Sequence, residues 1–244
     1  MTNIWICHGS LTHLKNSKKN VIIIRSKSEE DLYIMRKLFA FTLAEVMLTM
    51  TIVGVVAAMT IPTLHYQRVK KEYSAKLRNF YSRMENSILD MEMDKGSFRD
   101  MKLPSTNRPA ADYDWYINNI DPYMGHSYVN KDSHRVYYKD GSSLTFICGN
   151  GCGCLDVSYD VNGDKGPNKT GYDKQTFLYC FSDANRNTYF GNKDVFFGTY
   201  GAGHTAAGTT REQMITKCSS SASYCTRLLQ NDQWEFKGDY PFKF

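Results

Sequence analysis

One carboxylate stands inside a long apolar stretch of the sequence. Residues 41–64 read FTLAEVMLTMTIVGVVAAMTIPTL and carry a single charged side chain, Glu45. An ionisable group is costly in lipid, so its presence there indicates a function. The chemistry available to it is electrostatic, because a desolvated carboxylate needs a cation or hydrogen-bond donors beside it. The alternative is a position close enough to the membrane surface for Glu45 to stay hydrated.

A second group of oxygen-bearing side chains occurs in the stretch DVNGDKGPNKTGYD, which starts at Asp160. Asp160, Asn162 and Asp164 alternate along the chain, and Asp173 closes the stretch. Calcium takes several oxygen ligands from short polar loops, with glycine at the sharp turns. Position twelve is Gly171 and not glutamate, so the stretch is not an EF-hand. It predicts either a calcium site with these four ligands or a tight turn without metal.

Six of the seven cysteines lie in about the last hundred residues: Cys148, Cys152, Cys154, Cys180, Cys218 and Cys225. An even set in one region predicts disulfides and an oxidising compartment. The alternative is a zinc site in CGNGCGC, but that stretch lacks a second paired motif and a neighbouring histidine. Six cysteines allow fifteen pairings, and the sequence does not choose among them.

The apolar stretch itself predicts a membrane-spanning helix. A helix needs about 20 apolar residues to cross a bilayer, and residues 41–64 exceed that length. A cleaved secretory signal has a shorter apolar core with its small residue after it, whereas Ala40 comes before this one. Basic residues flank both ends, so they do not decide the orientation. The six clustered cysteines favour a C-terminal domain outside the cytoplasm.

The residues around Ala40 resemble a known processing motif. Arg36 and Lys37 precede the small residue Ala40, and FTLAE follows it. This pattern resembles the N-terminal motif of type IV prepilins and of the pseudopilins of type II secretion systems, in which the small residue is usually glycine. The resemblance extends over about 30 residues. It implies that a prepilin peptidase cuts between Ala40 and Phe41 and methylates the new amine of Phe41.

The resemblance also implies a role for Glu45. In that family the new α-amine of Phe41 in one subunit can meet the carboxylate of Glu45 in its neighbour. Opposite charges attract strongly in a low-dielectric setting and are costly when unpaired, so the pair would set the register of subunits in a filament. The implied partners are the prepilin peptidase, other pilin or pseudopilin subunits, an inner-membrane assembly platform and, before assembly, lipid.

The N-terminal 40 residues are expected to be absent from the mature protein. Met35 begins MRKLFA, a six-residue leader of the family's shape. Residues 1–34 are then either part of a long leader or an upstream extension from a misassigned start codon. In both cases Cys7 is absent from the mature protein and forms none of the predicted disulfides. Residues 1–40 hold seven of the 30 Lys/Arg, which leaves 23 Lys/Arg and 22 Asp/Glu in residues 41–244. No nucleic-acid partner is therefore expected.

The helical pattern continues beyond the predicted span. Apolar residues recur every three or four positions: Val69, Tyr73, Leu77, Phe80, Met84, Ile88 and Met91. This spacing places them on one face of a helix. We predict one helix from residue 42 to 95, about 80 Å long, which ends at Gly96. Its parts are the transmembrane half, 41–64, and the periplasmic half, 65–96.

Residues 97–244 form the predicted globular domain. We expect mostly loop over 97–134, with a short helix at 113–120. A hairpin follows, with strands 135–139 and 143–148 on either side of a turn at Asp140-Gly141. Two further strands are expected at 155–159 and 176–181, and a C-terminal helix at 211–229. A strand near 195–200, a Gly- and Thr-rich loop over 198–210 and an aromatic tail complete the pattern. The fold class is α+β, pilin-like, with the long helix packed on a small antiparallel sheet. The resemblance further implies a loop closed by a disulfide between Cys218 and Cys225. By analogy with some pseudopilins, it also implies calcium binding.

The sequence shows no catalytic set. Its six histidines are scattered, and it has neither a nucleophile elbow nor a phosphate loop. We therefore expect a non-enzymatic filament subunit, located in the bacterial inner membrane and then in a periplasmic or extracellular fibre. One alternative is a minor pilin whose domain binds DNA or a surface at the fibre tip. Another is a membrane-anchored periplasmic enzyme.

Overall fold

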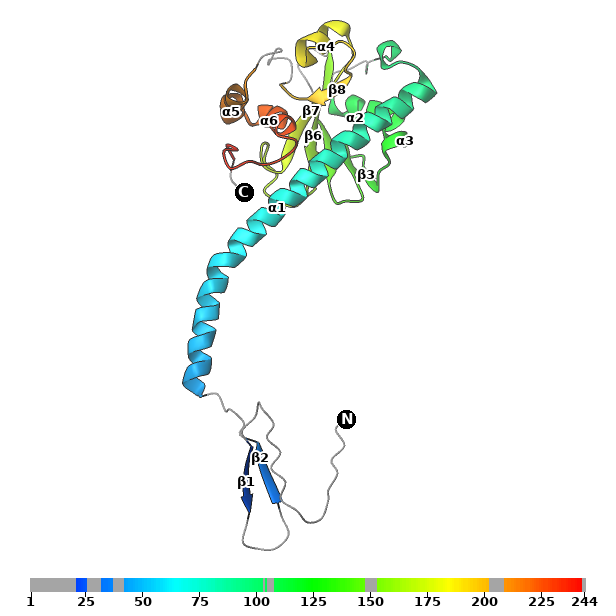
Figure 1. Ribbon diagram of the computed structural model, residues 1–244. Helices are drawn as coiled ribbons and strands as arrows, with labels where there is room; N and C mark the ends of the chain where they lie inside the picture. The colour runs from blue at the N-terminus through cyan, green and yellow to red at the C-terminus, as the bar shows by residue number, and fades with distance from the viewer. Residues whose placement is uncertain are drawn as a thin grey trace. The chain divides into compact units, whose positions relative to one another are not determined.

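The computed structural model describes residues 21–25, 32–36, 42–102, 104, 108–147, 153–201 and 209–242 (Figure 1). The chain divides into two compact units, residues 1–59 and 60–244. Helix α1, Leu43–Lys95, belongs to both. The predicted processing position, between Ala40 and Phe41, lies outside the described residues.

Helix α1 confirms the predicted helix almost to the residue. It ends at Lys95, and Gly96 follows with a φ of 88°, a left-handed conformation that glycine adopts without steric cost. Pro62 lies inside the helix without ending it. Six residues of the predicted stripe are buried and Val69 is partly buried; the buried ones are Tyr73, Leu77, Phe80, Met84, Ile88 and Met91.

The second unit contains a six-stranded antiparallel sheet. Its strands are β3 Tyr128–Asn130, β4 Arg135–Tyr137, β5 Ser143–Ile147, β6 Cys154–Asp160, β7 Lys174–Cys180 and β8 Phe197–Thr199. Neighbours in the sheet follow the chain order from β3 to β8. The predicted hairpin is β4–β5, and Gly141 takes a φ of 80° in its turn. The α+β class is thus confirmed.

The core lies between the sheet and the second-unit part of α1. The ring of Phe80 stacks on Tyr159 of β6 with centroids 3.9 Å apart, and the ring of Phe177 of β7 lies 5.2 Å away. Helix α2, Pro109–Asn119, adds Tyr116 and Trp115 to the same core. These aromatic contacts join segments far apart in the sequence, so they hold α1 on the sheet.

The opposite face of the sheet carries a smaller apolar cluster. Cys154, Leu178 and Cys180 are buried there, and Tyr189 and Phe190 of α4, Asp183–Phe190, pack against them. The sequence analysis did not predict α4. Its signals are present, however, because Ser182 accepts a hydrogen bond from the backbone of Asn185 at the start and Gly191 is left-handed at the end.

Two segments differ from expectation. Residues 97–134 are not mostly loop. They contain a short 3₁₀ helix at Phe98–Asp100, helix α2 at Pro109–Asn119, helix α3 at Asp121–Met124 and strand β3 at Tyr128–Asn130. Pro109 is the first residue of α2, where proline favours a helix start. The C-terminal segment is not one helix, since the chain becomes extended at Ser221 between α5, Arg211–Ser220, and α6, Cys225–Asn231.

The first unit contains a strand pair that was also not predicted. Strands β1, Val21–Arg25, and β2, Leu32–Arg36, pair antiparallel. The run VIII at residues 21–24 is the signal for β1, because β-branched residues favour strands. Residues 1–34 show no apolar periodicity, and a short continuous apolar run cannot be assigned by periodicity.

Candidate functional site

Glu45 lies in the first turn of α1 and makes a reciprocal set of hydrogen bonds with Thr42. The backbone N–H and the hydroxyl of Thr42 donate to Glu45 Oε2 at 2.8 and 3.0 Å. The backbone N–H of Glu45 donates to Thr42 Oγ1 at 3.2 Å. This is a capping box, which satisfies donors that a helix start leaves without partners. Sequence reasoning missed it, although threonine three residues before glutamate is its signal.

The capping box gives the carboxylate of Glu45 a partner within the same chain. Glu45 is exposed in the structure, and its predicted partner, the amine of Phe41, lies outside the described residues. A capped carboxylate at a helix N-terminus also interacts favourably with the helix dipole. Within the described residues, Glu45 therefore contacts Thr42 at the start of α1 and forms no ion pair with a residue far away in the sequence.

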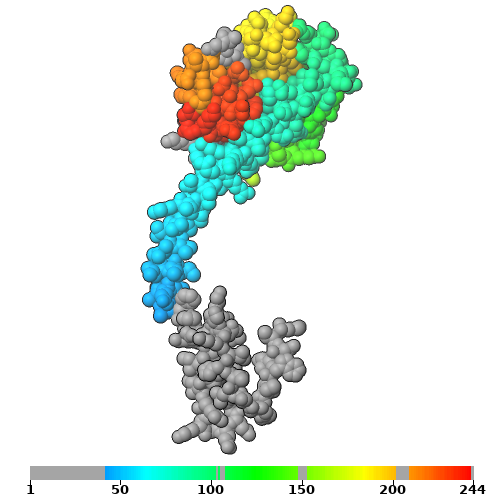
Figure 2. All heavy atoms as spheres, viewed as in Figure 1, coloured from blue at the N-terminus to red at the C-terminus, as the bar shows by residue number. Residues whose placement is uncertain are grey.

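The helix behind Glu45 carries a continuous apolar surface. Twelve large apolar side chains are exposed on it: Leu43, Val46, Met47, Leu48, Met50, Ile52, Val53, Val55, Val56, Met59, Ile61 and Leu64. Figure 2 draws the atoms of this part of α1 in blue. By length and composition α1 is the one helix of the described residues that could cross a membrane. Such a surface is unfavourable in water and must be covered by lipid or by other helices.

The predicted calcium ligands do not gather as one set. Asp173 is buried, and its two carboxylate oxygens accept the backbone N–H groups of Asn168 and Lys169 at 2.8 and 2.7 Å. Asp164 instead pairs with Arg135 on the surface and accepts the hydroxyl of Tyr137.

The other two predicted ligands, Asp160 and Asn162, have partners both inside and outside the loop. Asp160 Oδ1 accepts the N–H of Asn162 at 3.2 Å, and Asp160 Oδ2 lies 3.8 Å from the ammonium of Lys174. The side-chain amide of Asn162 donates to the hydroxyl of Tyr73 on α1 at 2.9 Å. Asn162 Oδ1, the oxygen that would bind a metal, has no hydrogen-bond partner among the described residues. The described residues contain no group of three or more His, Cys, Asp or Glu side chains placed to hold a metal.

A calcium titration tests this interpretation. Because Asp164 faces Arg135 and Asp173 already accepts two N–H groups, we expect the midpoint of thermal unfolding to be the same in millimolar calcium as in EDTA. A midpoint that rises with calcium in the wild type but not in Asp160→Asn would contradict the expectation and restore the predicted site.

The structure pairs four of the six predicted disulfide cysteines. Cys154 of β6 is bonded to Cys180 of β7, its direct neighbour across the two strands. Cys218 of α5 is bonded to Cys225 of α6. Cys148 and Cys152 lie outside the described residues.

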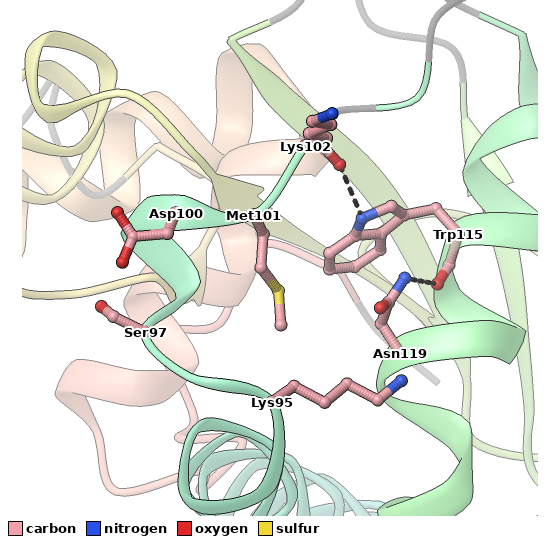
Figure 3. A pocket seen from close by; sticks show the side chains of 7 residues that line it. All are labelled: Lys95, Ser97, Asp100, Met101, Lys102, Trp115 and Asn119. Atoms are coloured by element: carbon pink, nitrogen blue, oxygen red, sulfur yellow. Dashed lines mark hydrogen bonds between the residues drawn. The ribbon is translucent and has the colours of Figure 1, made fainter.

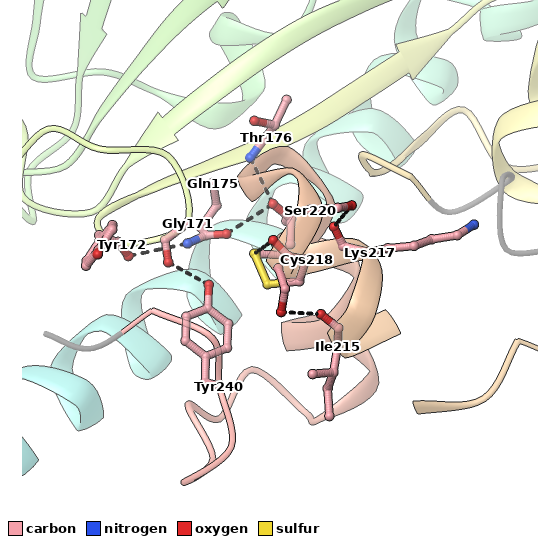
Figure 4. The surroundings of a disulfide bond; sticks show 12 residues. Gly171, Tyr172, Gln175, Thr176, Ile215, Lys217, Cys218, Ser220 and Tyr240 are labelled. Carbon is pink, nitrogen blue, oxygen red and sulfur yellow. Dashed lines mark hydrogen bonds between the residues drawn. A yellow bond between two sulfur atoms is a disulfide. The ribbon is translucent and has the colours of Figure 1, made fainter. Parts of the chain in front are cut away.

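The Cys218–Cys225 bond spans the break between α5 and α6 and lies close to the edge of the sheet (Figure 4). Strand β8 pairs with β7 only over Phe177–Tyr179. Just before that stretch, the hydroxyl of Thr226 on α6 accepts the N–H of Thr176 at 2.9 Å. The disulfide therefore helps to hold α6 in place, and α6 supplies the hydrogen-bond acceptor for the N–H of Thr176 in β7.

The two disulfides are expected to contribute unequally to stability. In the chain-entropy account, stabilisation grows with the length of chain that a bond closes. The Cys154–Cys180 separation of 26 residues corresponds to about 3.5 kcal/mol, and the Cys218–Cys225 separation of 7 to about 2.4 kcal/mol. Urea unfolding of the two double Cys→Ala variants should show the larger loss for the first pair. Equal losses in the free energy of unfolding would mean that strand pairing, rather than loop closure, determines how much each disulfide contributes.

One pocket of about 300 Å³ lies beside the C-terminal end of α1 (Figure 3). It is lined by Lys95, Ser97, Asp100, Met101, Lys102, Trp115 and Asn119. The Trp115 indole donates to Lys102 O at 3.2 Å, and Asn119 Nδ2 donates to Trp115 O at 2.8 Å. These bonds hold the wall of the pocket together. Two polar side chains of the lining already contact the backbone: Lys95 donates to Asn118 O at 2.5 Å, and Ser97 Oγ accepts the N–H of Arg99 at 3.3 Å.

The described residues contain one close histidine–carboxylate pair. His126 Nδ1 lies 2.5 Å from Asp121 Oδ2. Burial raises the pKa of Asp121, and His126 acts in the opposite direction. No described serine, threonine or cysteine side chain hydrogen-bonds to His126. The pair therefore joins α3 to the chain that follows it and does not complete a triad.

Several carboxyl groups of the second unit have raised pKa values. Burial raises the pKa of Asp112, Asp156 and Asp160 to about 6, and nearby Asp156 and Asp173 contribute at Asp112 and Asp160 respectively. Asp112 is only 1% exposed, and neither of its carboxylate oxygens has a hydrogen-bond partner among the described residues. A buried carboxylate without donors favours its neutral form.

Stability is therefore expected to fall as pH rises between about 4 and 7. The folded protein binds more protons than the unfolded chain in this window, so the stabilisation is complete below the unfolded pKa and is lost through the folded pKa of about 6. Asp112→Asn should reduce this slope and make the variant more stable relative to wild type at pH 7.5 than at pH 4.5. Urea unfolding at both pH values measures the difference, and an unchanged slope would contradict it.

Comparison with known proteins gives one match. A family model described as a family of unknown function, DUF6613, matches residues 63–244. No curated protein and no solved structure matched the chain. The matched part begins at the end of the apolar surface, so that it covers the second half of α1 and the sheet domain.

Proposed function

Since the chain belongs to the DUF6613 family, a family of unknown function, we propose a function from its own residues: it is a structural subunit of a filament of the type IV pilus or type II secretion pseudopilus kind. The subunit is held in the inner membrane by the N-terminal half of α1 and is processed between Ala40 and Phe41 by a prepilin peptidase. It then polymerises through the same half-helix.

The observation that carries this proposal is the exposed apolar surface of α1 with one carboxylate at its start. Twelve large apolar side chains are exposed between Leu43 and Leu64, each worth about 1.5–3 kcal/mol when fully buried. The same surface suits two environments in turn, lipid before assembly and the neighbouring helices of a filament after it. In a helix that served only as an anchor, Glu45 would act as the cap alone, and its charge would have no further use.

The proposed role of Glu45 is to set the register of neighbouring subunits. In the monomer its charge is satisfied by the capping box with Thr42. In a packed helical interior the carboxylate is removed from water, so an additional cation becomes favourable. The methylated amine of Phe41 in an adjacent subunit would supply that cation, and it would exist only after processing.

The globular domain fits an external, non-catalytic role. It contains two disulfides, which persist in oxidising compartments. Its core is built from the aromatic contacts between α1 and the sheet. These features support a domain that is displayed on a filament and packs against its neighbours.

The decisive experiment is the intact mass and N-terminal sequence of the protein purified from its native membrane. We expect a chain that begins with N-methylated Phe41. A mature chain that begins at Met1 or Met35 would overturn the proposal and favour a membrane-anchored protein that is not processed. Electron microscopy of sheared surface or periplasmic fractions, with antibodies against the domain, then tests for the filament.

A further inference from the structure

A groove on α1 lies directly beyond the apolar surface. Its lining residues are Leu64, Gln67, Arg68, Lys71 and Glu72, and we call it the cationic groove. Arg68 and Lys71 are exposed, and neither forms an ion pair within the described part of the chain. Glu72, the acidic residue of the groove, lies 3.2 Å from Lys76 instead. Two cations therefore face outward without a carboxylate to neutralise them.

A third cation nearby is already engaged. The ammonium of Lys70 lies 4.4 Å from the centroid of the Tyr66 ring, a cation–π contact. The same group donates to the carbonyl of Phe236 in the C-terminal tail at 3.5 Å. Lys70 thus ties the helix to its own domain, whereas Arg68 and Lys71 project from another side of α1. Of these three neighbouring cations, Arg68 and Lys71 are the two that line the groove.

The position of the groove along the helix matches the headgroup layer of a bilayer. From Leu43 to Leu64 the helix rises about 33 Å at 1.5 Å per residue, close to the hydrocarbon thickness of about 30 Å. Arg68 and Lys71 lie four and seven residues further, about 6 and 10 Å. The headgroup region adds about 5–8 Å on each side.

The direction of the side chains brings both cations into that layer. Side chains of an α-helix tilt toward its N-terminus, which here is the membrane side. Long basic side chains also extend so that their apolar stems cover apolar surface while their charged ends reach the interface. Tyr66, one turn before Lys70, is of the residue type that is enriched at this depth.

We propose that the cationic groove binds the phosphate of an anionic phospholipid, with an acyl chain against Leu64, while the unassembled subunit resides in the membrane. The proposal rests on the membrane insertion in the proposed function. Its consequence is that the lipid fixes the depth and rotation of α1 before assembly. Each cation near an anionic surface contributes about 1 kcal/mol, so loss of both should weaken lipid binding roughly tenfold or more.

The test uses the full chain, extracted from membranes in mild detergent and incubated with equal amounts of phosphatidylglycerol and phosphatidylcholine. Native mass spectrometry counts the lipids that each variant retains. We expect the wild type to prefer phosphatidylglycerol, and we expect this preference to fall to about a tenth or less in Arg68→Gln/Lys71→Gln. Arg68→Lys/Lys71→Arg should keep it. Lys131→Gln/Lys165→Gln, which removes two exposed cations of the domain, is the control with the same change in charge.

Three results would overturn the inference. The first is equal phosphatidylglycerol retention by wild type and Arg68→Gln/Lys71→Gln. The second is an equal loss in the control variant, which would show that only total charge matters. The third is displacement of the lipid by inorganic phosphate at the same concentration, which would identify a general anion site. Failure of the wild type to fractionate with membranes would instead refute the proposed function, so the two failures are distinguishable.

Discussion

Glu45→Gln should abolish filament formation while leaving membrane insertion unchanged. Glutamine keeps the shape and the hydrogen-bond acceptor of the capping box, in which either glutamate or glutamine can serve, so this variant removes only the charge. In a helical interior the amine of Phe41 would then be buried without its partner. Breaking a buried ion pair costs about 3–5 kcal/mol, which corresponds to a loss of assembly of at least about a hundredfold. Filament yield by shearing and immunoblotting measures it, beside membrane fractionation.

Thr42→Ala is the matched control for this variant. It removes the hydroxyl that caps α1 but leaves the carboxylate charged, and loss of such a cap costs about 1 kcal/mol of helix stability. We expect filaments from Thr42→Ala and none from Glu45→Gln. The reverse outcome, filaments only from Glu45→Gln, would show that Glu45 serves as a helix cap and not as a charge.

Phe80→Ala should cause the largest loss of folding stability in the domain. The Phe80 ring is only 2% exposed and contacts the rings of Tyr159 and Phe177. Removing a buried phenyl group costs about 3–5 kcal/mol, because apolar burial is lost and a cavity remains. The contact joins α1 to the centre of the sheet, so the variant should also loosen the helix. Urea unfolding followed by circular dichroism gives the free energy of unfolding.

Leu89→Ala provides the comparison on the same helix. Leu89 is 57% exposed, so its truncation removes little buried surface and should change the free energy of unfolding by less than about 0.5 kcal/mol. Similar losses for the two variants would mean that α1 is not held on the sheet through Phe80. Hydrogen exchange of residues 73–91 would show the same contrast as faster exchange in Phe80→Ala alone.

Local patterns in the sequence were enough to predict the elements that carry the proposed function. The three- and four-residue spacing from Val69 to Met91 defined one face of α1, and Gly96 marked its end. The turn at Asp140-Gly141 located the β4–β5 hairpin, and the apolar length of residues 41–64 defined the candidate span. Each of these signals depends on residues a few positions apart, where backbone geometry alone decides which side chains share a face.

The elements that were missed have signals of a weaker kind. Strand β1 is a short continuous apolar run, which periodicity cannot assign. The capping box of Thr42 and Glu45 was overlooked because the motif that contains it suggested an intersubunit role first. The break at Ser221 lies in the run SSSAS, residues 219–223, and a serine cluster of this kind is a weak signal for a loop.

The apolar half of α1, its single carboxylate, the stripe that faces the sheet and the α+β class could all be predicted from residue types and spacing. Three features became known only from the packed structure: Cys154 pairs with Cys180, Asp164 pairs with Arg135, and Asp112 is buried with no hydrogen-bond partner among the described residues. The two residues of each pair are far apart along the chain. These features depend on the register between strands and on packing across the core, where many arrangements are compatible with the same local propensities and the total burial and hydrogen bonding select one.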